Sequence, residues 1–128
     1  MAEARKPARA RPMPTESSEQ IKTVLKFSMF YPKEAQLLIA IPNGSYRKPL
    51  EAIRLKREGV KPGMTDLMLL MPRGGFHGLC IEMKRADGGV VSPVQKKMHA
   101  LLVEQGYMIS VCAGSDQAYK ALEDYLKL

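Results

Sequence analysis

The sequence is poor in cysteine, in aromatic residues and in long apolar runs, and each shortage excludes a class of protein. Cys80 and Cys112 each stand alone within an apolar run, so no paired spacing indicates a zinc site or a redox motif. We expect both to be reduced residues of the core, which suits a cytosolic compartment. Aromatic residues form 6% of the chain, too few for a platform on which single-stranded bases would stack.

The chain also lacks the run of roughly 18 apolar residues that a membrane helix requires, and its first residues lack the apolar stretch of a secretion signal. We therefore expect a cytoplasmic protein with no membrane association. Residues 1–15 are rich in Ala, Arg and Pro and are predicted to form a disordered basic tail. Residues 16–128 have the size of a single compact domain, which can fold without disulfides or structural metal.

Positive charge is in excess, because 20 Lys and Arg residues against 13 Asp and Glu residues give a formal net charge of +7. This balance favours an anionic partner, nucleic acid first and a membrane surface second. Residues 47–61 hold six basic residues against two acidic ones, so they are expected to contact DNA phosphates, although an ordinary solvated face is the alternative. The residues expected to bind DNA are Arg47, Lys48, Arg54, Lys56 and Arg57. Nothing here resembles a pattern that reads base edges, so we expect recognition of DNA shape.

Hydrophobic periodicity and breaker residues predict an α/β fold, a mixed sheet with helices on its faces. Capping boxes at Ser17–Gln20 and Ser92–Gln95 indicate two helix starts. Apolar residues at helical spacing support the first helix: Ile21, Val24, Leu25 and Met29. The expected order is helix 18–30, strand 36–41, helix 49–59, hairpin strands 66–71 and 78–84, helix 93–105, strand 107–112 and a last helix after residue 115.

Two carboxylates stand on the predicted hairpin. If its loop is centred on Gly74, Asp66 lies opposite Glu82, with Cβ atoms roughly 4.5–5.5 Å apart. Carboxylates this close, on otherwise apolar strands, repel each other and lose hydration, and a divalent cation relieves both costs. Their oxygen atoms favour Mg²⁺ or Mn²⁺ over a softer metal.

Lys84 lies two residues beyond Glu82, so both side chains project from the same face of a strand expected to be central. A metal ion there can activate water and stabilise charge on a phosphate, and a nearby ammonium can assist either task. The alternative is a structural Glu–Lys pair, with Asp66 merely ending a loop. His77 and His99 have no partners at ligand spacing, and we expect no catalytic role for either.

Asp66 followed by Glu82-x-Lys84 resembles the pattern of the PD-(D/E)xK nucleases. More specifically, the segments IPNGSYR, EGVKPGMTDL, IEMKR and SPVQKK, and the strand from EQGY to VC, are similar in order and spacing to the VRR-NUC family of virus-type replication-repair nucleases. The resemblance covers residues from about 16 to 128.

This resemblance implies a restriction-endonuclease-like core and metal-dependent hydrolysis of DNA phosphodiester bonds. Stand-alone members of similar length look like phage or bacterial proteins, typically homodimers associated with branched DNA such as four-way (Holliday) junctions. Longer members carry the domain in DNA-repair enzymes. By position, the resemblance implies that Asp66, Glu82 and the carbonyl of Met83 bind Mg²⁺ or Mn²⁺, and that Lys84 is the catalytic lysine.

Two further roles follow from the resemblance, each with a structural alternative. Glu19 matches the acidic metal ligand of the first helix, but it is also an ordinary first-turn acid with Glu16 and Glu34 nearby. Gln95 matches the catalytic glutamine, but it is also the third residue of a capping box. Thr65 departs from the family, which usually has proline before the aspartate; this position shapes the backbone and supplies no ligand.

The sequence therefore predicts a metal-dependent endonuclease for branched DNA, acting as a homodimer. Within enzymes, the alternative is a nuclease that acts on flaps, ends or ordinary duplex. Outside enzymes, the alternative is a non-catalytic basic DNA-binding module whose acidic cluster is structural.

Overall fold

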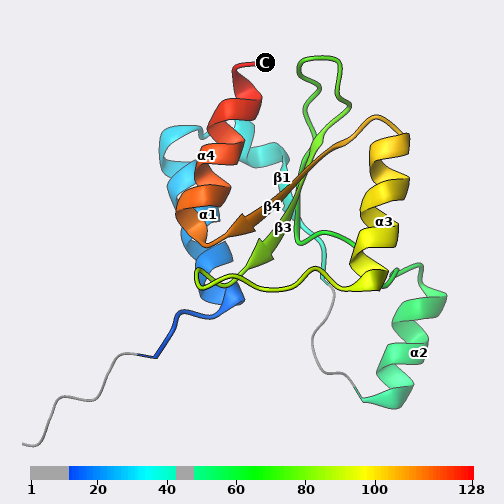
Figure 1. The fold of residues 1–128 in the computed structure, drawn as a ribbon. Coiled ribbons are helices and arrows are strands. Elements are labelled where there is room, and N and C mark those ends of the chain that lie inside the picture. Colours follow the sequence, from blue (N-terminus) through cyan, green and yellow to red (C-terminus); the bar gives the residue numbers. More distant parts are fainter. Residues whose placement is uncertain (1–11, 43–47) are drawn as a thin grey trace, which may run out of the picture.

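A computed structural model describes residues 12–42 and 48–128. Its elements, in chain order, are α1 (Glu16–Phe30), the 3₁₀ turn η1 (Glu34–Leu37), β1 (Leu38–Ala40), α2 (Pro49–Arg57), β2 (Leu67–Leu69), β3 (Leu79–Lys84), α3 (Pro93–Glu104), β4 (Met108–Ala113) and α4 (Ser115–Leu126). The strands form a mixed sheet in the order β1-β2-β3-β4, and the predicted α/β architecture is confirmed (Figure 1). Most of the predicted tail, residues 1–11, lies outside the described residues.

The hairpin has the predicted register. Leu67 pairs with Ile81, Met68 with Cys80 and Leu69 with Leu79, all antiparallel. The connecting turn contains Gly74 and Gly75 at φ values of 55° and 86°, a left-handed conformation that glycine adopts without steric cost. On its other side β3 pairs in parallel with β4, so β3 lies in the interior of the sheet as expected.

Helices cover both faces of the sheet. Figure 1 shows α1 and α4 on one side and α3 on the other. Leu79, Ile81 and Met83 of β3 join the apolar core on the side of α1 and α4, together with Phe27 and Leu122. The alternate residues of β3 point the other way, toward α3, and are also buried. Both cysteines are free and buried, as predicted.

α1 differs from its predicted start. Its N-cap is Thr15, whose Oγ1 accepts a hydrogen bond from the Ser18 N–H at 3.0 Å. The predicted cap at Ser17 is therefore wrong, because Ser17 already lies within the helix. The 3₁₀ turn η1 also occupies the first two residues of the predicted strand 36–41, and β1 has only three residues.

The exposed side of α1 carries three of the four apolar residues that predicted the helix, and the fourth, Val24, packs against the core. Ile21, Leu25 and Met29 are 65%, 60% and 67% exposed. The buried side consists of Glu19, Thr23 and Phe27, which follow one another at intervals of four residues. The apolar periodicity therefore predicted the helix correctly but gave no indication of which side faces the core.

α2 stands apart from the sheet, below α3 in Figure 1. It begins with Pro49 at its first turn, as predicted, and it buries no residue. Leu50 is 82% exposed on it. Within the described residues, no helix combines the length and the apolar character needed to cross a membrane.

Candidate active site

Asp66 and Glu82 are neighbours at the end of the hairpin, and a hydrogen bond joins their side chains. The β2–β3 ladder ends at the pair Leu67–Ile81, and the Asp66 N–H also donates to the Ile81 carbonyl at 2.9 Å, one residue out of the register of that ladder. The Asp66 carboxylate in turn accepts a hydrogen bond from the Met83 N–H at 2.7 Å through Oδ2. This contact holds Asp66 against the backbone of β3 at Met83, the residue whose carbonyl the family resemblance implies to be a metal ligand.

Glu82 is a buried carboxyl group, with a side chain that is 2% exposed. Burial raises its pKa to about 8, and a hydrogen bond with Asp66 and the negative charge of Asp66 act in the same direction. The positive charge of Lys84 opposes this increase, and the charge of Glu16 adds to it. The charged form of Glu82 is therefore costly, and a divalent cation bound beside it would stabilise that charged form.

Lys84 is held by α3. Its Nζ donates to Oε1 of Gln95 at 3.1 Å, and the lysine is only 8% exposed. The same Gln95 oxygen accepts the backbone N–H of Ser92 at 3.0 Å, while the Gln95 N–H donates to Oγ of Ser92. The capping box is therefore confirmed, and the same side chain also contacts the predicted catalytic lysine.

His99 is a site residue that the sequence reasoning missed. Its Nε2 lies 3.1 Å from Oε1 of Glu82. Burial and the charge of Lys84 lower the pKa of His99. The spacing contained a signal, because a residue four positions after Gln95 shares its side of a helix. His77, in contrast, is exposed and lies at the edge of the Tyr107 ring, with ring centroids 6.0 Å apart.

Glu19, the predicted metal ligand of the first helix, is directed elsewhere. Its Oε2 accepts the backbone N–H of Ser115 at 2.6 Å, at the start of α4, where the preceding Gly114 has no side chain to cap the helix. This hydrogen bond lowers the pKa of Glu19. A negative charge at a helix N-terminus also interacts favourably with the helix dipole. The geometry thus gives Glu19 a structural role, and its metal role stays a prediction that no contact here supports.

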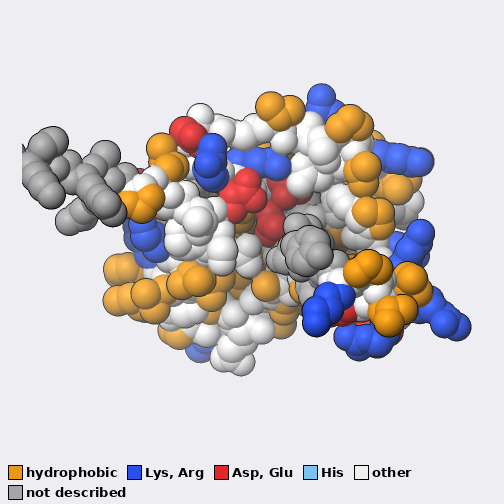
Figure 2. All heavy atoms as spheres, turned by 90° about the horizontal axis from the view of Figure 1, so that it is seen from below, with side chains coloured by type: hydrophobic (Ala, Val, Ile, Leu, Met, Phe, Trp, Pro, Cys, Tyr) orange, Lys and Arg blue, Asp and Glu red, His pale blue; other side chains and the backbone are white. Residues whose placement is uncertain are grey.

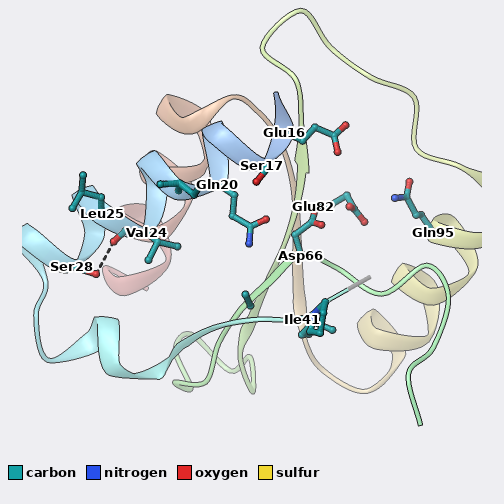
Figure 3. Close-up of a pocket in the computed structure, with 13 residues that line it drawn as sticks. Glu16, Ser17, Gln20, Val24, Leu25, Ser28, Ile41, Asp66, Glu82 and Gln95 are labelled. Atoms are coloured by element: carbon teal, nitrogen blue, oxygen red, sulfur yellow. Dashed lines mark hydrogen bonds between the residues drawn. The ribbon is translucent and has the colours of Figure 1, made fainter. Parts of the chain in front are cut away.

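Glu16, three residues earlier, is the acid of α1 that faces the site. It lines an open cleft of about 850 Å³ together with Gln20, Asp66, Glu82 and Gln95. Figure 3 shows the side chains of Glu16, Glu82 and Gln95 directed into the same space. The cleft continues along α1 past Ile21 and Leu25.

The donor atoms suit a hard divalent cation. In residues 12–42 and 48–128, no three His, Cys, Asp or Glu side chains are grouped to hold a metal ion. Two adjacent carboxylates remain, one of them buried with a raised pKa, and they are oxygen donors of the kind that Mg²⁺ and Mn²⁺ prefer. Such an ion would be held by Asp66 and Glu82, with further oxygen from the Met83 carbonyl and from water.

Three of the five basic residues predicted to bind DNA lie on the exposed helix α2: Arg54, Lys56 and Arg57. Arg54 donates to Glu58 at 3.1 Å, and both side chains are more than half exposed. Lys48, Lys56 and Arg57 are also exposed, and Arg47 lies outside the described residues. Figure 2 shows acidic side chains at the centre of one face of the molecule, with Lys and Arg side chains on several sides of them.

Comparisons with known proteins agree with this architecture. The sequence profile of the VRR-NUC domain matches residues 8–116. A solved structure described as a VRR_NUC domain protein superposes with a TM-score of 0.81 and is 29% identical, covering 92% of this chain and 93% of its own. No curated protein sequence matches the chain. The profile covers most of the chain, and the chain therefore belongs to the VRR-NUC family of nucleases.

Proposed function

We propose that the protein is a divalent-metal-dependent DNA endonuclease that hydrolyses phosphodiester bonds, with Asp66, Glu82 and Lys84 at its centre. The observation that carries this proposal is a pair of neighbouring carboxyl groups lining an open cleft, Glu82 buried and Asp66 partly buried, with Lys84 on the same strand face as Glu82. A purely structural pair has no need of an open cleft. A nuclease requires one, because the DNA backbone must reach the metal.

Each residue has a distinct task in this mechanism. Asp66 and Glu82 would hold the metal, and Asp66 is already oriented by the Met83 N–H at 2.7 Å. When bound, Mg²⁺ or Mn²⁺ supplies an activated water and stabilises the charge that develops on the phosphate. Lys84 keeps its ammonium at the site through Gln95, where it can orient the water or neutralise a phosphate oxygen. Gln95 thus positions the lysine as well as capping α3.

The proposed substrate is branched duplex DNA, such as a four-way junction, cut by a homodimer. The support is the family resemblance, together with the fit between a two-fold enzyme and a substrate with paired strands to cut. The exposed basic residues of α2 would contact phosphates and would read shape, since phosphate contacts carry no sequence information. Flaps, ends and ordinary duplex are the alternative substrates, and a non-catalytic DNA-binding module is the alternative function.

Cleavage of a labelled four-way junction beside a linear duplex of matched sequence tests the proposal. Wild-type protein and Lys84→Ala would be compared with Mg²⁺, with Mn²⁺ and with chelator. We expect metal-dependent cutting of the junction by the wild type only, with DNA binding retained by Lys84→Ala. Equal rates on both substrates would remove the junction preference. Binding without cutting under any metal would favour the non-catalytic module.

A further inference from the structure

The contact between His99 and Glu82 is buried and joins two secondary-structure elements. The Glu82 side chain is 2% exposed and that of His99 is 12% exposed, and Nε2 lies 3.1 Å from Oε1. A hydrogen-bond partner at this distance fixes the rotation of the carboxyl group. Free rotation would otherwise change the direction of both Glu82 oxygens.

α3 is a rigid support for this contact. Its start is fixed by the capping box of Ser92 and Gln95 and by Pro93 in the first turn. Gln95 and His99 are one turn apart on the helix, and their partners Lys84 and Glu82 are two residues apart on one face of β3. Two successive residues on one side of α3 therefore contact two successive residues on one face of β3.

We propose that His99 is a positioning residue, which donates from Nε2 to Oε1 of Glu82 and leaves Oε2 oriented to bind the metal ion. Both the imidazolium and one neutral tautomer carry a proton on Nε2, so the contact is available in either form. The inference rests on the proposed function, because it assigns Glu82 to the metal. It adds a residue that does not itself bind the metal but hydrogen-bonds to a metal ligand, and residues of this kind commonly determine metal affinity.

The test is calorimetric titration of Mn²⁺ into DNA-free protein, for wild type, His99→Leu, His99→Asn and His99→Gln. Leucine fills the space without a donor, and asparagine is polar but too short to reach Glu82. We expect Mn²⁺ affinity to fall about 10- to 100-fold in both variants. Glutamine places an N–H₂ donor near the original Nε2, so His99→Gln should recover most of the affinity. His77→Leu is the matched control and should bind Mn²⁺ as the wild type does.

Cleavage at limiting and saturating Mn²⁺ gives a second measurement. His99→Leu and His99→Asn should cut slowly at low Mn²⁺ and regain rate as Mn²⁺ is raised, because the defect lies in metal binding. If His99→Leu does not fold, the His99→Asn and His99→Gln pair decides the matter. Wild-type affinity in His99→Asn, or equal losses in Asn and Gln, would overturn the positioning role.

The same titration separates the two proposals. A wild type that binds Mn²⁺ and cuts DNA, with unchanged His99 variants, overturns the role of His99 and leaves the nuclease function intact. A wild type that neither binds Mn²⁺ nor cuts overturns both.

Discussion

The two faces of β3 are equally buried but are stabilised in different ways. On one face, the side chains that pack into the apolar core between the sheet and helices α1 and α4 are Leu79, Ile81 and Met83. On the other face, Glu82 and Lys84 are 2% and 8% exposed against α3. Burying apolar groups stabilises a fold, whereas burying charged groups costs free energy unless each one is paired. The apolar face therefore supports the sheet, and the polar face retains a cost that metal-dependent chemistry would explain.

The largest contrast is expected between adjacent residues on opposite faces. Ile81→Ala should lower the free energy of unfolding by about 2–5 kcal/mol, because it leaves a cavity in the core. Glu82→Gln should abolish cutting without a comparable loss of stability, because the amide matches the buried carboxyl group in shape and removes a group that is costly to ionise. Urea unfolding and junction cleavage would be measured on both variants. A Glu82→Gln protein that unfolds as easily as Ile81→Ala would mean that the polar face also supports the fold.

A second contrast concerns the two acids of α1. Glu16→Ala should lower Mn²⁺ affinity about 10-fold, because Glu16 faces the cleft. Glu19→Ala should lower the free energy of unfolding by about 1–2 kcal/mol, because it removes the acceptor for the Ser115 N–H. Calorimetric titration and urea unfolding of both variants would check this. The reverse result would restore Glu19 as the ligand that the family resemblance implies.

The polar face also predicts a pH dependence of stability. Without metal, the raised pKa of about 8 keeps the proton on native Glu82 up to about pH 8, whereas in the unfolded chain Glu82 loses it near its ordinary pKa of 4.5. Between these values the native state binds more protons, so the contribution of Glu82 to stability falls as pH rises. Urea unfolding in chelator at pH 5 and pH 8 should show this decline in wild type and a smaller one in Glu82→Gln. An identical pH dependence in both proteins would contradict the raised pKa.

The smallest effect is expected from α2, which belongs to neither face. Joint replacement of Arg54, Lys56 and Arg57 by Ala should leave stability nearly unchanged, because α2 buries no residue. It should also flatten the slope of log affinity against log salt by about 1 for each side chain that contacts a phosphate. A charge-matched control would replace residues outside the cleft: Lys33, Lys120 and Lys127. An unchanged slope in the α2 variant would exclude α2 as a phosphate-binding element.

Local patterns were sufficient to predict the hairpin and its carboxylates. Strand alternation and a turn centred on Gly74 fix the register, and the register brings Asp66 and Glu82 together at the end of the hairpin. No comparable rule fixes how a helix is rotated about its axis. The apolar residues of α1 recur at helical spacing, yet the side of α1 that packs inward is the one with Thr23 and Phe27.

That rotation decides which acid of α1 faces the cleft. With Thr23 and Phe27 inward, Glu19 is carried toward α4, and Glu16 is left beside the carboxyl pair. The contact of His99 depended in the same way on the placement of α3 over β3: the spacing from Gln95 puts His99 on the same side of the helix, but it does not say which way that side faces. The sequence thus predicted the residues joined by strand pairing more reliably than those brought together by helix packing.

β3, α3 and β4 follow one another in the chain, so most of the candidate site comes from one continuous segment. Glu82, Lys84, Gln95 and His99 all come from this single stretch of chain, and Asp66 is the hairpin's addition to it. Splitting the chain between Gly74 and Gly75 into two fragments would leave this module uncut and would join Asp66 to it only through non-covalent pairing. The four residues would then lie on one fragment that could be transferred to another protein as a unit, and Asp66 would be supplied by the other fragment.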